Sequence, residues 1–478
     1  MAAENKTVAK RSMFTPVDMT QGTPWIQIAT FAVPLLIGNV VQQLYNTVDS
    51  IVVGKYVGDN ALAAVGSAQP IMMIMIVIFI GIGTGVSVMV AQYLGARKRE
   101  ELSITIANAM SLTAIFVVII MVVASLLTRP MLVLLKTPES YIDWSQQYLL
   151  FMFIGSAGHA FYNLLNGILR GLGDSVSAMI FLVISCVLNI FGDLFCVAVL
   201  GMGVAGVALA TVVAQFISAV LCFLKMRRMT DMFDIKPAYF RIRGAYIRDI
   251  MRLGLPTGLM QAVMSLSMLI TQPVTNQFGE SVVAANVMVQ RVDGFATLPS
   301  FTFGISMTTF AGQNFGAGRM DRVEKGTRQG LVLSVLVSAV LTAVILMAGR
   351  TLMGLFTNTE SQITLAMSFM YILAAGYITL AITQTLSGVM RGCGDAATPM
   401  WISIAMNVIV RVPLVYILRE LTRSEQYPLG RAQIIFVSLL ATWVLGAVIT
   451  VIVFRMGKWK NRRRVGESST PAGGAAAE

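Results

Sequence analysis

The sequence has 478 residues, of which 56% are hydrophobic and only 12% are charged. Soluble domains carry about 25% charged residues, so this chain has too little polar surface to cover a globule in water. Its mean hydropathy of +0.76 indicates a protein whose surface faces lipid. The net charge of +12 is spread over many connecting segments instead of one surface, which argues against a nucleic-acid-binding protein.

Apolar stretches long enough to cross a bilayer recur along the chain. A membrane-spanning helix needs about 20 predominantly apolar residues, and the sequence predicts twelve such spans. The segment before the first span is polar and lacks the apolar core of a signal peptide, so we expect that span to remain as an anchor. Several longer runs predict tilt, kinks or extension beyond the bilayer. The predicted spans are residues 25–53, 60–93, 102–127, 141–169, 175–200, 203–225, 249–277, 281–315, 328–348, 361–390, 396–418 and 432–455.

Lysines and arginines concentrate in alternate connecting segments, on the side of the membrane that both termini share. By the positive-inside rule this side is cytoplasmic. We therefore expect a multi-pass protein of a bacterial cell (inner) membrane with both termini in the cytoplasm. The predicted divisions are an N-terminal arm (1–20), an N-terminal lobe (21–228), a cytoplasmic linker (229–247), a C-terminal lobe (248–457) and a basic, then disordered tail (458–478).

The two halves of the chain repeat one another. GILRGLGD (167–174) matches GVMRGCGD (388–395), QYLGARK (92–98) matches QNFGAGR (313–319), and VGDNALAAVG (57–66) matches FGESVVAANV (278–287), all at an offset of 221 residues. Six spans per repeat place both halves in the membrane with the same orientation. The sequence thus predicts an all-α integral membrane protein whose two six-helix bundles are related by a pseudo-twofold axis along the membrane normal.

This duplication indicates a transporter. Two similar bundles around a central cleft can rock against each other, which supplies the two states of alternating access. A channel needs a continuous pore and does not require the duplication. Within the repeated motif GxxRGxGD, we interpret the glycines as helix caps, the arginine as a partner of the last helical carbonyls, and the aspartate as the start of the next helix.

A few ionisable side chains fall inside predicted spans, where a charge costs about 2.5–3.5 kcal/mol on insertion scales and is usually functional. They are Asp49, Asp193, Arg291, Asp293 and Arg411. Arg291 and Asp293 are two residues apart and cannot face each other on a helix. For these two and Arg411 we expect charge pairing between helices or a gating role, with Arg411 as a candidate partner of Asp293.

Two polar stripes lie in the N-terminal half. Spacings of three and four residues place Gln42, Tyr45 and Asp49 on one helix face, and Asn189 and Asp193 on another. These stripes predict a small hydrated pocket. An aspartate there could exchange a proton, or could bind Na⁺ together with neighbouring amide and hydroxyl oxygens. The alternative interpretation is a hydrogen-bonded clamp between helices with no coupling role.

The sequence has no catalytic or metal-binding pattern. Its four cysteines lie in or beside apolar runs without a CxxC pair, and the single histidine, His159, has no neighbouring ligands at metal-binding spacing. HExxH and GxSxG motifs are absent. We therefore predict that the protein is not an enzyme and needs no cofactor or structural metal.

Taken together, these motifs resemble the multidrug and toxic compound extrusion (MATE) family. The residues that carry the resemblance are Pro34, the segment QQLYNTVDSIVVGKYVGDNALAAVG, the two GxxRGxGD blocks and the paired Q-x-x-G-A segments. The resemblance covers about residues 20–457. It implies a monomeric antiporter that exports small cationic or amphipathic organic compounds by alternating access, driven by H⁺ or Na⁺.

The resemblance also implies a site. The DinF-like branch of this family has a polar cluster in its N-terminal half, and the matching positions here are Gln42, Tyr45, Asp49, Asn166, Asn189, Asp193 and Thr211. We assign ion coupling, with possible Na⁺ ligation, to Asp49, Asn189, Asp193 and Thr211, and substrate contact to Gln42, Tyr45 and Asn166.

The sequence departs from the pattern of the family at one point, and two other classes of membrane protein are alternatives. The NorM-like branch has acids in spans 7 and 10, where this chain has Gln261, Thr383 and Gln384, so the coupling site is expected in the N-terminal half only. A flippase for lipid-linked precursors has a related architecture, but often with extra spans and a basic central cavity. The major facilitator group is disfavoured because the loop YLGARKREEL does not match its glycine-flanked pattern.

Overall fold

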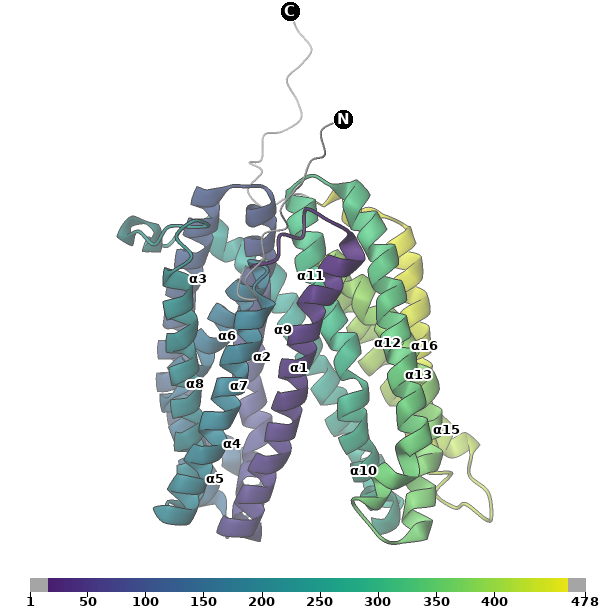
Figure 1. The fold of residues 1–478 in the computed structure, drawn as a ribbon. Helices are drawn as coiled ribbons and strands as arrows, with labels where there is room; N and C mark the ends of the chain where they lie inside the picture. The colour runs from purple at the N-terminus through teal and green to yellow at the C-terminus, as the bar shows by residue number, and fades with distance from the viewer. Residues whose placement is uncertain (1–15, 463–478) are drawn as a thin grey trace, which may run out of the picture.

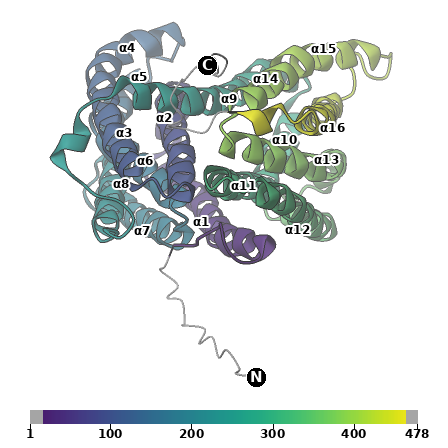
Figure 2. The ribbon, with the colours of Figure 1, turned by 90° about the horizontal axis from the view of Figure 1, so that it is seen from above.

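The computed structural model describes residues 16–462, without the side chains of residues 50, 51, 53, 54, 59 and 62, and its regular elements are all helical. Figures 1 and 2 show two helical lobes side by side. The N-terminal lobe contains α1 (Pro24–Val52), α2 (Asp59–Gly95), α3 (Arg99–Ile119), α4 (Ser125–Leu134), α5 (Ile142–Ile154), α6 (Ser156–Gly171), α7 (Ser175–Asp193) and α8 (Gly203–Arg227). The C-terminal lobe contains α9 (Gly244–Gln277), α10 (Glu280–Ala296), α11 (Leu298–Gly316), α12 (Met320–Gly354), α13 (Glu360–Gly392), α14 (Ala397–Ile404), α15 (Arg411–Leu421) and α16 (Ile434–Arg455).

Several predicted spans are built from more than one helical piece. Ten spans of the described chain are long and apolar enough to cross a membrane as single units, and the pair α5–α6, bent by 51°, makes an eleventh. The remaining predicted span, 281–315, corresponds to α10 and α11, neither of which passes the same criterion by itself. Pro299 explains the break at Thr297, because proline has no N–H to continue a helix but fits the first turn of a new one.

Short π-helical turns lie within or at the ends of several spans. They lie at Val53–Val57, after α1, at Ile120–Ala124, between α3 and α4, and at Leu194–Val199, directly after Asp193. A fourth, Ala405–Val410, directly precedes Arg411. Such turns occur often at functional sites because they displace side chains from the regular helical register.

The predicted linker packs against the end of α3. Arg99 forms an ion pair with Asp234 at 2.9 Å, and this hydrogen-bonded contact holds the pKa of Asp234 below its usual range. Asn108 accepts a hydrogen bond from the backbone N–H of Arg243 at 2.7 Å and donates one to the carbonyl of Tyr239 at 3.0 Å. The linker therefore joins the two lobes as an ordered segment.

The lobes are joined closely at one end of the bundle. This end, which we call the basic face, holds the turns after Gly95, Gly171, Gly316 and Gly392. At this face Gln92 donates a hydrogen bond to the carbonyl of Gly392 at 2.8 Å, and its repeat equivalent Gln313 donates one to the carbonyl of Gly171 at 3.1 Å. Toward the opposite end the lobes splay apart, as α1 and α10 show in Figure 1.

The paired Q-x-x-G-A segments make this contact possible. A Cβ atom added to Gly95 would lie 1.9 Å from the carbonyl oxygen of Gln313, and one added to Gly316 would lie 2.0 Å from that of Gln92. The backbones of α2 and α11 therefore touch directly, and only glycine fits at either position. The repeat noticed in the sequence thus forms a reciprocal seal between the lobes.

Candidate functional site

A cavity of about 740 Å³ lies between the two lobes. Helices α1, α2, α5, α6 and α8 line it from the N-terminal lobe, and α9, α10, α11 and α13 line it from the C-terminal lobe. This volume is in the range of pockets that hold drug-sized molecules. Its charged lining residues are Asp49, Arg170, Arg291 and Arg391.

Asp49 and Asp193 come together at the N-terminal side of this cavity. Asp49 lines the cavity, whereas Asp193 is fully buried behind it, and the two carboxyl groups lie within hydrogen-bonding reach of each other. Asn189 donates hydrogen bonds to Asp193 and to the hydroxyl of Thr211, both at 3.3 Å. The expected i, i+4 relation of Asn189 and Asp193 is thus present, and α1 and α8 complete the cluster.

Several oxygens of this cluster lack a hydrogen-bond donor. Among the described residues, Oδ1 of Asp49, Oδ1 of Asn189 and Oδ2 of Asp193 are buried without a hydrogen-bond partner. A buried polar atom without a partner is costly. Two adjacent carboxylates also repel each other unless a proton or a cation lies between them. The cluster therefore has the chemistry of a site for H⁺ or for a small hard cation that prefers oxygen ligands.

The other predicted residues divide between the cavity and its wall. Gln42 and Tyr45 line the cavity, and the Tyr45 hydroxyl lies within hydrogen-bonding reach of Thr211. Asn166 is not among the lining residues. It donates hydrogen bonds to the hydroxyl of Tyr162 at 3.2 Å and to the carbonyl of Ala178 at 3.5 Å, and so connects α6 to α7.

The C-terminal lobe has a separate polar group. Asp293 lies within hydrogen-bonding reach of the Tyr377 hydroxyl, and Arg411 is near enough to attract its charge, although the two do not form an ion pair within 4.0 Å. Both line a small cavity of about 50 Å³. Arg411 and Asp293 therefore lie near each other without forming the ion pair that the sequence suggested. Arg291 instead has an exposed side chain that lines the central cavity.

The two GxxRGxGD motifs form helix caps and also contribute to the central cavity. Gly173 and Gly394 have φ angles of 87° and 89°, and Asp174 caps α7 by accepting a hydrogen bond from the backbone N–H of Ser177. These features agree with the caps expected from the sequence. Arg170 and Arg391 lie in the last turns of α6 and α13, as expected, and both also line the central cavity. Their position in the cavity depends on lobe packing. The sequence offered one indication of it, which is that the arginine occurs in both repeats.

Tyr148 is a further residue that the sequence did not single out. It is buried, lines the central cavity and is close enough to Asp49 and Asp193 to interact with their charges. It comes from α5, in a segment that reads as an ordinary apolar span. No local pattern would have separated it from the other aromatic residues.

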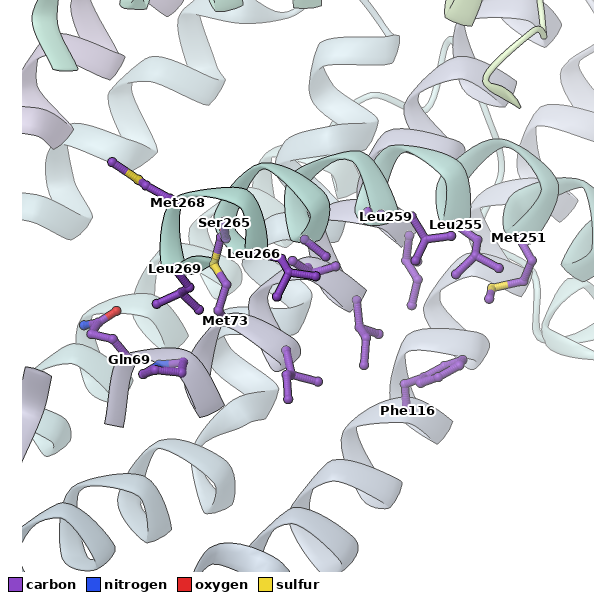
Figure 3. A pocket seen from close by; sticks show the side chains of 18 of the residues that line it. Gln69, Met73, Phe116, Met251, Leu255, Leu259, Ser265, Leu266, Met268 and Leu269 are labelled. Atoms are coloured by element: carbon purple, nitrogen blue, oxygen red, sulfur yellow. The ribbon is translucent and has the colours of Figure 1, made fainter. Parts of the chain in front are cut away.

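A second, apolar groove of about 800 Å³ runs between the two lobes along α2 and α9. Figure 3 shows Met251, Leu255, Leu259 and Leu266 along α9, with Phe116 of α3 across the groove. Gln69 lines both the groove and the central cavity. An apolar surface therefore reaches the edge of the polar cavity.

The sequence profile of the MatE family matches the chain twice, at residues 34–195 and 256–417. The chain belongs to the MatE family. The two matches are 222 residues apart, which confirms the internal repeat.

Curated relatives and solved structures agree with this assignment. The probable multidrug resistance protein YoeA of Bacillus subtilis is 30% identical over 84% of this chain and 88% of its own length. The probable multidrug resistance protein YpnP of the same organism is 26% identical over 93% and 97%. The crystal structure of a MATE protein in complex with MaL6 superimposes with a TM-score of 0.86 at 25% identity, over 92% of this chain and 97% of that one. The protein is therefore a MATE transporter with the two-lobed fold of this family, and it is not an enzyme.

Proposed function

We propose that this transporter exports small cationic or amphipathic organic compounds in exchange for H⁺ or Na⁺, and that Asp49 and Asp193 bind the coupling ion. The observation that carries the proposal is the pair of neighbouring carboxyl groups with buried, unpartnered oxygens at the edge of a drug-sized cavity. The names of the relatives, which describe multidrug resistance proteins, support export of organic compounds.

The two acids can couple ion binding to a change in the lobe. Asp49 belongs to α1 and Asp193 to α7, so an ion between them links two helices of the same lobe. When the ion leaves, repulsion between the carboxylates favours separation of these helices. Asp193 directly precedes a π-helical turn, where a helix can change register at modest cost.

Asn189 and Thr211 leave both ions possible. Their amide and hydroxyl oxygens suit Na⁺, whereas the short distance between the two carboxyl groups also suits a shared proton. We assign no separate cofactor and propose that the protein works as a monomer.

The lobes provide the second half of the mechanism. The reciprocal contact of Gly95 and Gly316 closes the cavity at the basic face, while the lobes separate at the other end. We propose that the basic face is cytoplasmic, in accord with the positive-inside rule, in a bacterial inner membrane. The structure then corresponds to an outward-facing state, and a rocking motion that breaks the seal opens the cavity to the cytoplasm.

The flippase alternative keeps one point in its favour, which is the three arginines of the cavity. It is weakened by the Asp49–Asp193 pair, which a flippase for lipid-linked precursors does not require. Movement of a lipid-linked sugar without any ion gradient would favour the flippase.

The proposal can be tested with purified protein in liposomes. Asp193→Asn should abolish organic-compound export that is driven by an imposed H⁺ or Na⁺ gradient, while the amount of protein in the membrane stays normal. Asp143→Asn is a matched control, because Asp143 is an exposed acid of the same lobe in a surface pair with Arg129. Comparing the two imposed gradients identifies the ion. Normal gradient-driven export by Asp193→Asn would rule out the coupling role.

A further inference from the structure

Charge is distributed unevenly in the central cavity. Three arginines and one aspartate line it, and the aspartate, Asp49, lies beside a second acid, Asp193, at the N-terminal side of the cavity. Arg170 and Arg391 occupy equivalent positions in the two repeats, at the ends of α6 and α13 near the basic face. The pseudo-twofold arrangement of the lobes therefore brings one arginine from each lobe to the same cavity.

These arginines have no acidic partner in the described part of the chain. Arg391 is only 8% exposed, and neither it nor Arg170 takes part in an ion pair. Nε of Arg170 is buried without a hydrogen-bond partner. Removing a guanidinium from water without a compensating anion is costly, so an anion that enters the cavity would gain from both groups.

The acids of the same motifs are occupied elsewhere. Asp174 contacts Lys225 at 3.5 Å, and Asp395 contacts Arg462 at 3.0 Å. Each of these acids also accepts a hydrogen bond from the first turn of the following helix, from Ser177 and Thr398 respectively. The motif therefore neutralises its aspartates with other bases and leaves its arginines facing the cavity.

We propose that Arg170 and Arg391 form a binding site for the anionic group of an amphipathic substrate, such as a carboxylate, a phosphate or a sulfate. This inference rests on the proposed export function and narrows its substrate class. The planar guanidinium forms two parallel hydrogen bonds to such groups, which makes arginine well suited to bind them. Arg291, with its exposed side chain in the same cavity, adds a third positive charge that attracts the anion.

The central cavity also offers apolar surface to the same substrate class. Ile76, Ile80, Met264 and Ile305 line it together with the arginines, so a molecule with a charged head and an apolar body has suitable surfaces for both parts. A small hydrophilic anion would use only the arginines.

The test compares two probes with the same apolar body and opposite head charges. Dansyl-labelled undecanoic acid and dansyl-labelled undecylamine are titrated by fluorescence against the full-length protein in nanodiscs of neutral lipid. The wild type should bind the carboxylate more tightly than the amine. Arg170→Gln and Arg391→Gln should each raise the Kd of the carboxylate by about tenfold or more, since hydrogen bonds to charged groups are among the stronger ones, and should leave amine binding unchanged or tighter.

Two controls separate binding from folding. Arg129→Gln removes an exposed arginine of the same lobe and should bind both probes as the wild type does. Arg391→Lys retains the charge without the planar fork and should lose only part of the affinity. Arg391→Lys also replaces Arg391→Gln in the comparison if the glutamine variant is not monodisperse. Inorganic phosphate is added as a competitor. If it displaces the probes while the preference for the carboxylate over the amine is the same in all variants, the site binds a free anion and the amphipathic class is overturned.

The outcome is independent of ion coupling. Asp193→Asn should retain carboxylate binding even though gradient-driven export is lost, so failure of the coupling proposal and failure of this inference are distinguishable. The inference is overturned if the wild type binds the amine at least as tightly as the carboxylate. It is also overturned if both glutamine variants bind the carboxylate with wild-type affinity.

Discussion

The seal at the basic face should open when a single methyl group is added to it. In Gly316→Ala the new Cβ would lie 2.0 Å from the carbonyl oxygen of Gln92, and in Gly95→Ala it would lie 1.9 Å from that of Gln313. The obstructing atoms are backbone oxygens, so the helices themselves must move apart by about 1 Å to restore an ordinary contact. Overpacking of this kind costs about 1–3 kcal/mol.

This cost applies only while the seal is closed. A state in which α2 and α11 separate avoids it, so the ratio of sealed to unsealed protein should fall by roughly 5-fold to 160-fold. Neither glycine has a positive φ angle. Alanine is therefore compatible with the local helix and is expected to favour it slightly. The effect should thus be on the lobe arrangement, with no matching loss of global stability.

Spin labels can measure the change directly. Nitroxides at Glu100→Cys and Asp321→Cys occupy repeat-equivalent, exposed positions of the two lobes near the basic face. The four native cysteines are buried, which limits background labelling. Double electron–electron resonance should show longer distances between the labels in Gly95→Ala and in Gly316→Ala than in the parent protein.

Gly66→Ala is the matched control. Gly66 lies on the same helix as Gly95, and a Cβ there would meet nothing within 4 Å. It should leave the distance distribution unchanged. If Gly95→Ala and Gly316→Ala also leave it unchanged, the glycine contact does not hold the lobes together, and the assignment of the seal is wrong.

Two further substitutions test the ion site and the repeated motif. Thr211→Val removes the hydroxyl that accepts from Asn189, and should raise the ion concentration for half-maximal export by up to about tenfold, as expected for one hydrogen bond. Thr257→Val, in the cavity wall of the other lobe, should not, and equal effects of the two would argue against a local role. Gly394→Ala places a Cβ at a φ of 89° and should lower the melting temperature by about 1–2 °C, because the strain is about 1–2 kcal/mol and the chain is long. Gly354→Ala, where a Cβ meets nothing within 4 Å, should be neutral in the same thermal-shift assay, and a wild-type melting temperature for Gly394→Ala would refute the strain argument.

The sequence by itself determined the features that depend on near neighbours in the chain. Hydropathy placed the membrane passages, because each span buries its own backbone hydrogen bonds and needs only enough apolar residues to cross the bilayer. Spacing placed Asn189 and Asp193 on one helix face, and the structure joins them by a hydrogen bond. The offset between the halves predicted two similar lobes, and the two matches to the MatE profile confirm them.

Only the tertiary structure decided which distant residues meet. The contact of Asp49 with Asp193 joins α1 to α7, and the seal joins Gly95 to Gln313 across the lobes. The sequence placed Arg170 and Arg391 at helix ends, where they lie, but only lobe packing shows that both also line the cavity. The division of span 281–315 into α10 and α11 was also missed. Helix periodicity says which residues share a face, whereas the neighbour of that face is set by how whole helices pack, and this depends on residues more than a hundred positions away.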